Sequence, residues 1–142
     1  MAHVGTRGHD EHSRSAAADV LRYFELAAPL HHQDEELHVF PALSSGGADV
    51  LPETVEALLS DHRSMEKLWT PMAVLLRDWL RPDAALPADD IARDCQQEFT
   101  RLYTAHLQTE EGIVFPAARA RMDAHALLSM SADMQRRRTQ PR

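Results

Sequence analysis

Residues 31–41 read HHQDEELHVFP, and residues 106–116 read HLQTEEGIVFP. In both stretches a glutamate follows a histidine by four residues, and Phe-Pro ends the stretch. Residues four apart lie on one face of an α-helix, about one turn from each other. A third pair with this spacing, His62 and Glu66, lies between the two stretches. The sequence therefore predicts three helices that each present one imidazole and one carboxylate on the same face.

The spacing of the apolar residues predicts three long helices and a shorter one. We expect them at residues 15–43, from about 52 to 80, from 89 or 90 to about 122, and at 123–138. A Ser-Ser-Gly-Gly turn at residues 44–47 separates the first two. No stretch shows the two-residue alternation of a half-buried strand. The expected fold is an all-α, antiparallel up-down arrangement, because short loops join neighbouring helices.

The His and Glu pairs interrupt the apolar stripe of each expected long helix. Burying an unpaired carboxylate costs several kcal/mol, and a small domain has only about 5–15 kcal/mol of stability in total. One such pair alone would be a surface pair or a satisfied core histidine, whereas three pairs indicate bound cations. The candidate metal ligands are the six residues at these positions: His31, Glu35, His62, Glu66, His106 and Glu110.

The donor types narrow the choice of metal. Imidazole and carboxylate ligands without cysteine indicate iron or manganese, with zinc also possible. His31 continues the apolar stripe of the first helix, and His32 is either a substitute ligand or a neighbour that supports one. Glu36 and Glu111 lie about 100° off the stripe. We therefore expect these two glutamates to be exposed or to hydrogen-bond a ligand.

Composition and charge exclude several classes of protein. The 142 residues are enough for one domain, and 44% of them are hydrophobic, as in soluble globular chains. A net charge of −7 disfavours binding to nucleic acid or to an anionic membrane. No apolar run is long enough to span a bilayer, and no N-terminal leader is evident. Cys95 has no second cysteine to pair with, so we expect a cytoplasmic protein.

These motifs resemble the hemerythrin-like (HHE cation-binding) domain family over roughly residues 15–120. The resemblance rests on the two Phe-Pro-terminated stretches and on the central Asp61–His62 with Glu66. It implies a four-helix bundle that holds two non-haem iron ions with an oxo or hydroxo bridge. Carried over to this chain, it implies terminal imidazoles and bridging carboxylates, with Glu66 at a position where relatives carry His or Glu. The implied imidazoles are His31, His62 and His106, and the implied bridges are Glu35 and Glu110.

The start of the chain differs from the family pattern. Relatives have a further helix, with another histidine ligand, before the segment that begins here near residue 15. We expect a polar stretch at residues 1–14, the helical domain at 15–138 and a frayed basic tail at 139–142. The first bundle helix would then be missing or replaced. Its absence would leave an apolar groove that the C-terminal segment partly fills or a second chain covers in a homodimer, or the domain would be destabilised.

The resemblance implies a small ligand that binds at the metals. We expect O2, or a related species such as NO or peroxide, bound for sensing, carriage or a stress response. Nothing beyond the metal site predicts a substrate pocket, so we favour binding over enzymatic turnover. Two alternatives are iron oxidation, storage or iron-centre repair at the same site, and a metal-free or zinc-stabilised helical interaction module.

Overall fold

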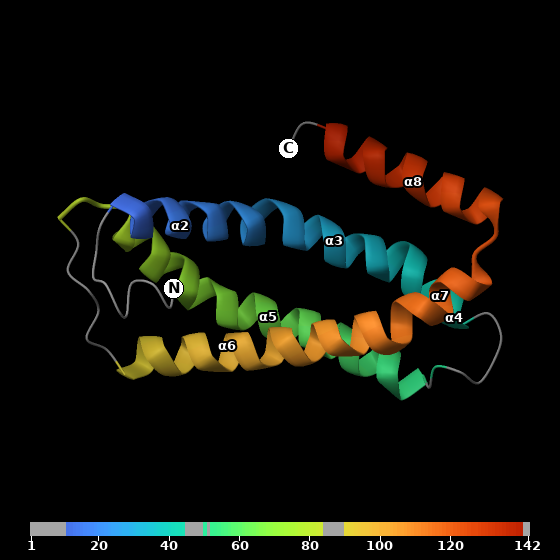
Figure 1. Ribbon diagram of the computed structural model, residues 1–142, viewed down its shortest axis with the longest axis horizontal. Helices are drawn as coiled ribbons and strands as arrows, with labels where there is room; N and C mark the ends of the chain where they lie inside the picture. Colours follow the sequence, from blue (N-terminus) through green and yellow to red (C-terminus); the bar gives the residue numbers. More distant parts are fainter. Residues whose placement is uncertain (1–10, 45–49, 51, 84–89, 141–142) are drawn as a thin grey trace. The chain divides into compact units, whose positions relative to one another are not determined.

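The structure is a computed structural model that describes residues 11–44, 50, 52–83 and 90–140. Across these ranges the chain forms helices and no strand, which confirms the all-α prediction (Figure 1). None of the described helices is long and apolar enough to cross a membrane.

The described residues form four helical segments, and π-helical turns (η) interrupt two of them. The first contains α2 (Glu11–Arg22), η1 (Tyr23–Ala27), α3 (Ala28–Asp34), η2 (Glu35–Val39) and α4 (Phe40–Ser44). The second is α5 (Pro52–Trp79). The third contains α6 (Asp90–Thr109), η3 (Glu110–Val114) and α7 (Phe115–Arg121), and the fourth is α8 (Ala124–Thr139).

All four expected helices are therefore present, with small differences at their ends. The first begins at Glu11, four residues earlier than expected, so the polar residues 11–14 are helical. Asp123 caps α8, since its carboxylate accepts a hydrogen bond from the Ala126 amide at 2.8 Å. The expected turn at Gly46–Gly47 lies outside the described residues, as do residues 1–10 and 141–142.

The chain divides into two compact units, and each long segment contributes to both. The first unit contains residues 1–28 and 63–103, and the second contains residues 29–62 and 104–142. Apolar side chains fill each unit separately. In the first they are Ala17, Leu21, Ala73, Leu76 and Trp79, with Met65, Met72 and Phe99; in the second they are Phe40, Leu43, Val50, Leu58, Val114 and Ala118.

The π turns shift the buried stripe in the second unit. A regular α-helix would continue the buried stripe from Glu35 to Val39 and Ala42. The structure instead buries Phe40 and Leu43. A π turn closes on a residue five positions back, so it adds one residue and moves every later side chain along the stripe by one position. After η3, Ala118 is buried and Ala117 is half-buried.

Candidate metal centre

Four side chains from three helical segments meet in the interior of the second unit. Glu35 begins η2, His62 lies on α5, His106 lies on α6 and Glu110 begins η3. Each is at most 3% exposed. Their ligand atoms all lie within 4.8 Å of one another. Two imidazoles and two carboxylates therefore converge in a buried space, and they are four of the six residues that the three-pair pattern indicates.

Distances within this group test whether it fits a cation. His106 Nε2 lies 2.6 Å from Glu110 Oε1, and His62 Nε2 lies 3.2 Å from Glu35 Oε2. Yet all four oxygens of the two glutamates, although buried, lack a well-aligned hydrogen bond from the part of the chain that the structure describes. Ligands about 2.1 Å from a metal and at right angles are about 3.0 Å apart. The spacing of these atoms and their unmet need for positive charge fit bound metal.

Two further carboxylates hold the imidazoles in orientation. Glu36 Oε1 lies 2.7 Å from His62 Nδ1, and Asp61 Oδ2 lies 3.2 Å from His106 Nδ1. An ionised carboxylate can only accept, so Nδ1 of each ring carries a proton, and in the neutral form of the ring Nε2 presents its lone pair to the buried group. Metal-binding histidines commonly have this arrangement, which fixes both the tautomer and the ring plane.

The two buried glutamates differ in their affinity for protons in the metal-free protein. Burial acts to raise the pKa of Glu35, but the nearby imidazoles of His31 and His62 outweigh it and lower that pKa below its usual range. Burial raises the pKa of Glu110, and the negative charge of Glu35 adds to this. In the metal-free protein, burial and the repulsion between the two carboxylates therefore favour protonation of Glu110 over Glu35.

The structure distinguishes the two adjacent histidines of the first segment. His32 Nδ1 or Nε2 converges with nitrogens of His62 and His106, and the His32 ring stacks on the His62 ring with centroids 3.9 Å apart. Burial and the neighbouring His62 lower the pKa of His32 to about 4, so its ring is neutral at pH 7. His31 is 41% exposed and its Nε2 lies 3.0 Å from Glu35 Oε1. His31 thus contacts a carboxylate of the buried group but belongs to neither set of converging atoms among the described residues.

Glu66 does not lie on the buried face, contrary to the sequence pattern. Its side chain is exposed, and the preceding Met65 takes the buried position on α5. The uninterrupted α-helix brings residue 65, not 66, round to the core three residues after His62. Glu36 and Glu111 are both exposed, as expected, and Glu36 also contacts His62.

Sequence reasoning did not identify the role of Asp61. Its partner His106 lies on another segment, 45 residues along the chain. The only signal in the sequence is an acidic residue next to a ligand candidate, which also describes Glu36 and Glu111. Of these three, the structure pairs Asp61 and Glu36 with imidazoles.

Ion pairs attach α8 to the segment that carries Glu35. Arg137 and Arg138 both donate to the buried carboxylate of Asp34, with Arg138 Nη2 at 2.6 Å from Oδ2. Burial alone would raise the pKa of Asp34, but the two arginines outweigh it and lower the pKa below 3.8. His38 Nε2 lies 2.7 Å from Asp133 Oδ2. No residue of α8 is buried, so polar contacts contribute much of its attachment.

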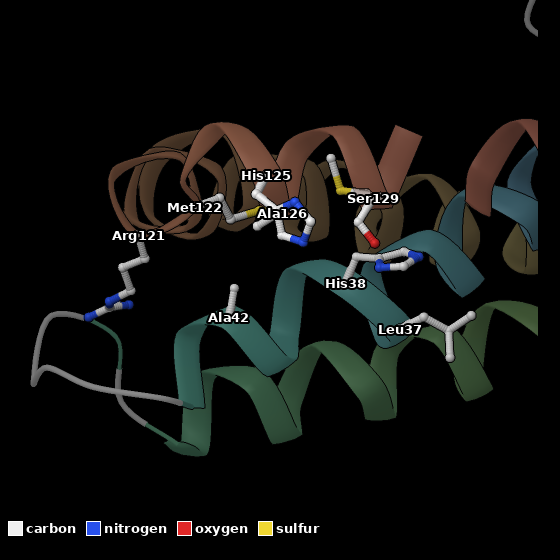
Figure 2. Close-up of a pocket in the computed structure, with 9 residues that line it drawn as sticks. Leu37, His38, Ala42, Arg121, Met122, His125, Ala126 and Ser129 are labelled. Atoms are coloured by element: carbon white, nitrogen blue, oxygen red, sulfur yellow. The ribbon is translucent and has the colours of Figure 1, made fainter. Parts of the chain in front are cut away.

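A separate open pocket of about 380 Å³ lies between α8 and the same segment. Figure 2 shows His125 and Ser129 reaching from α8 toward the helix that carries His38 and Ala42. Leu37, Arg121, Met122, Ala126 and Met130 complete the lining. The buried imidazole and carboxylate groups do not line this pocket, so it is distinct from the candidate metal centre.

Comparison with known proteins agrees with this geometry. The family model described as the hemerythrin HHE cation-binding domain matches residues 1–136. An uncharacterised protein of Haemophilus influenzae is 32% identical over 122 residues, which are 84% of this chain and 66% of the relative. The chain thus spans just under two thirds of that relative's length. The described residues form helices and no strand, they bring a cluster of His and Glu together in the interior, and the family model matches 136 positions. The chain therefore belongs to the hemerythrin HHE cation-binding domain family.

Proposed function

We propose that the protein binds two non-haem iron ions and uses them to bind O2 or a related species such as NO or peroxide. The observation that carries this proposal is the pair of buried glutamates whose four oxygens lack well-aligned hydrogen bonds among the described residues. They face the Nε2 atoms of His62 and His106. Iron, when bound, supplies an open coordination position and a reducible centre for such a ligand.

The chain's own residues would hold, orient and shield the metal. Glu35 and Glu110 would supply bridging negative charge, and His62 and His106 would supply imidazole nitrogens. His32, or His31 at the more exposed edge, would supply a further imidazole. Glu66 is left out of the proposed ligands because its side chain is exposed. We propose that the protein uses this ligand binding for sensing, carriage or a stress response.

Neighbouring residues support the site in two ways. Glu36 and Asp61 hold His62 and His106 in the orientation that aims Nε2 inward. The Phe40 ring stacks near His62 with centroids 5.9 Å apart, and Leu58 and Val114 belong to the same buried cluster. Apolar walls exclude water and strengthen the electrostatic attraction between carboxylates and a cation.

Metal content and a gas titration test the proposal. Protein purified without chelator is analysed for iron, manganese and zinc, then reconstituted with Fe(II) without air and exposed to O2 or NO. We expect about two iron ions per chain and new charge-transfer absorption in the near ultraviolet and visible. Less than about one-tenth of a metal equivalent, with no loss of thermal stability on chelation, would contradict the proposal.

Iron oxidation or storage is a second candidate at the same site. The observation that favours it is the 41% exposure of His31, whose Nε2 lies 3.0 Å from Glu35 Oε1 and marks an edge open to solvent. Steady-state consumption of O2 or peroxide with excess Fe(II) would support this candidate. Stoichiometric, reversible binding would support the first.

We also propose a homodimer in the cytoplasm. Leu37, Ile113 and Leu128 of the second unit are 51%, 48% and 71% exposed, and a second copy of the chain would cover such side chains. The single Cys95 suits a reducing compartment. Light scattering after gel filtration would give the mass in solution, and a monomer at all concentrations would exclude the dimer.

A further inference from the structure

Each of the two buried glutamates is the first residue of a π turn. Glu35 begins η2 and Glu110 begins η3. The Phe40 amide donates to the Glu35 carbonyl, and the Phe115 amide donates to the Glu110 carbonyl. These bonds reach back five residues instead of four, so each turn contains one extra residue. The backbone that carries each carboxylate is therefore also the backbone that closes a π turn.

A proline directly follows the residue that closes each turn. Pro41 follows Phe40, and Pro116 follows Phe115. Proline has no amide hydrogen to donate, and its ring clashes with the carbonyl four residues earlier in a regular α-helix. At these positions the carbonyls belong to Leu37 and Gly112. A wider turn relieves the clash without ending the helix.

Two other prolines show whether a proline ring is sufficient to produce a π turn. Pro29 follows η1, whose closing bond runs from the Ala28 amide to the Tyr23 carbonyl, and no candidate ligand begins that turn. Pro71 lies within α5, which remains α-helical from Pro52 to Trp79. A proline therefore favours a π turn but does not by itself create one. Side-chain packing must supply the rest.

Packing favours the wider turn at the first of the two sites. With the extra residue, Phe40 and Leu43 are buried, whereas a regular helix would place the smaller Val39 and Ala42 there. Burial of larger apolar side chains is the more favourable of the two registers. The same register sets Glu35 in the buried group and stacks Phe40 beside His62.

We propose that Pro41 and Pro116 are positioning residues for the metal centre. By excluding the regular hydrogen bond, they hold the two π turns, and these turns set the register of the Glu35 and Glu110 carboxylates. Both prolines are exposed, so they act through the backbone and not by filling the core. This inference rests on the proposed metal-binding function.

The first test measures metal affinity in proline variants. Co(II) is titrated against a chromophoric chelator with wild type, Pro41→Ala and Pro116→Ala, and the visible Co(II) spectrum reports coordination. We expect affinity to fall about 10- to 100-fold in both, the range seen when residues that orient ligands are changed. The matched control is Pro71→Ala, at an exposed proline without a π turn. It should remain within about twofold of wild type.

The second test follows the turns in the metal-free protein. Couplings across hydrogen bonds in NMR spectra should link Phe40 to Glu35 and Phe115 to Glu110 in wild type. In Pro41→Ala the first link should move to Glu36, while the melting temperature shows that the variant remains folded. Unchanged links in both variants, or changed links with wild-type affinity, would overturn the inference. If the wild type binds no Co(II) or iron, the proposed function fails, and the couplings still decide whether these prolines hold the turns.

Discussion

Replacing Glu110 or its neighbour Glu111 with glutamine gives the sharpest test of the buried face. Glu110 is 1% exposed, and its Oε1 lies 2.6 Å from His106 Nε2. Glu111 is exposed on the same turn. Glutamine keeps the size of each side chain, so neither variant opens a cavity. Glu110→Gln removes the charge from the proposed metal centre, whereas Glu111→Gln removes it from the surface.

The expected magnitude follows from linkage between binding and folding. At a metal concentration 100 times the dissociation constant, binding adds about 2.7 kcal/mol to the free energy of unfolding. For a chain of this length, about 3 °C per kcal/mol makes this a rise of about 8 °C in melting temperature. If Glu110→Gln weakens binding a hundredfold, the same concentration adds only about 0.4 kcal/mol, or about 1 °C.

Thermal melts with and without metal, together with metal analysis, measure these shifts. Glu111→Gln should keep the full rise in melting temperature. Glu110→Gln should lose at least one metal equivalent. Without metal it should melt no lower than wild type, because the removed carboxylate is one whose charged form burial and Glu35 disfavour. Equal metal-linked shifts in the two variants would refute the assignment of the buried face.

Three further substitutions and one titration have defined outcomes. Glu36→Leu removes the acceptor for the Nδ1 hydrogen of His62, and chelator competition should show metal binding about 10- to 100-fold weaker; wild-type affinity would mean that this contact does not orient the ring. Asp34→Asn should lower the free energy of unfolding by about 2–3 kcal/mol at pH 7, at the low end for a broken ion pair because Arg138 is 39% exposed. Because the arginines lower the pKa of Asp34, its stabilising effect is present above pH 3.8 and disappears as the pH falls through the lowered value, so denaturant curves of wild type and variant should converge in acid; a constant difference would contradict the pairing. In metal-free protein, NMR titration of the His32 ring should give a pKa of about 4, and a value of 6.5 would show that the ring is not buried. Gly112→Ala should raise the free energy of unfolding by about 0.5–1 kcal/mol in denaturant titrations, since no atom beyond the neighbouring residues and the local helix backbone lies within 4 Å of the added methyl group; a decrease would show that the turn needs glycine.

Much of the site could be predicted from local sequence. His62, His106, Glu35 and Glu110 are polar residues placed where helical periodicity demands apolar ones, and the structure buries all four together. Periodicity depends only on the backbone of one helix, so it can be read from neighbouring residues. The same reasoning was wrong about the burial of Glu66, which is exposed. Helical periodicity allows either of two adjacent residues on α5 to face the core at that turn.

The choice between neighbouring residues depended on tertiary contacts. His31 and His32 are adjacent, and only packing against His62 and His106 brings His32 into the group of converging nitrogens. The Asp61 contact with His106 likewise joins residues from different segments.

By itself, the sequence determined the helical class, the family and the residue types of the candidate metal centre, because each depends on a repeated local spacing. Only the tertiary structure decided the register after each π turn, and with it the burial of Phe40 and Leu43. Proline makes a wider turn favourable, but α5 accommodates Pro71 without one. Whether a turn is α-helical or π-helical depends on which side chains the neighbouring helices can bury. Those helices come from residues far apart in the chain, so local sequence does not predict the outcome.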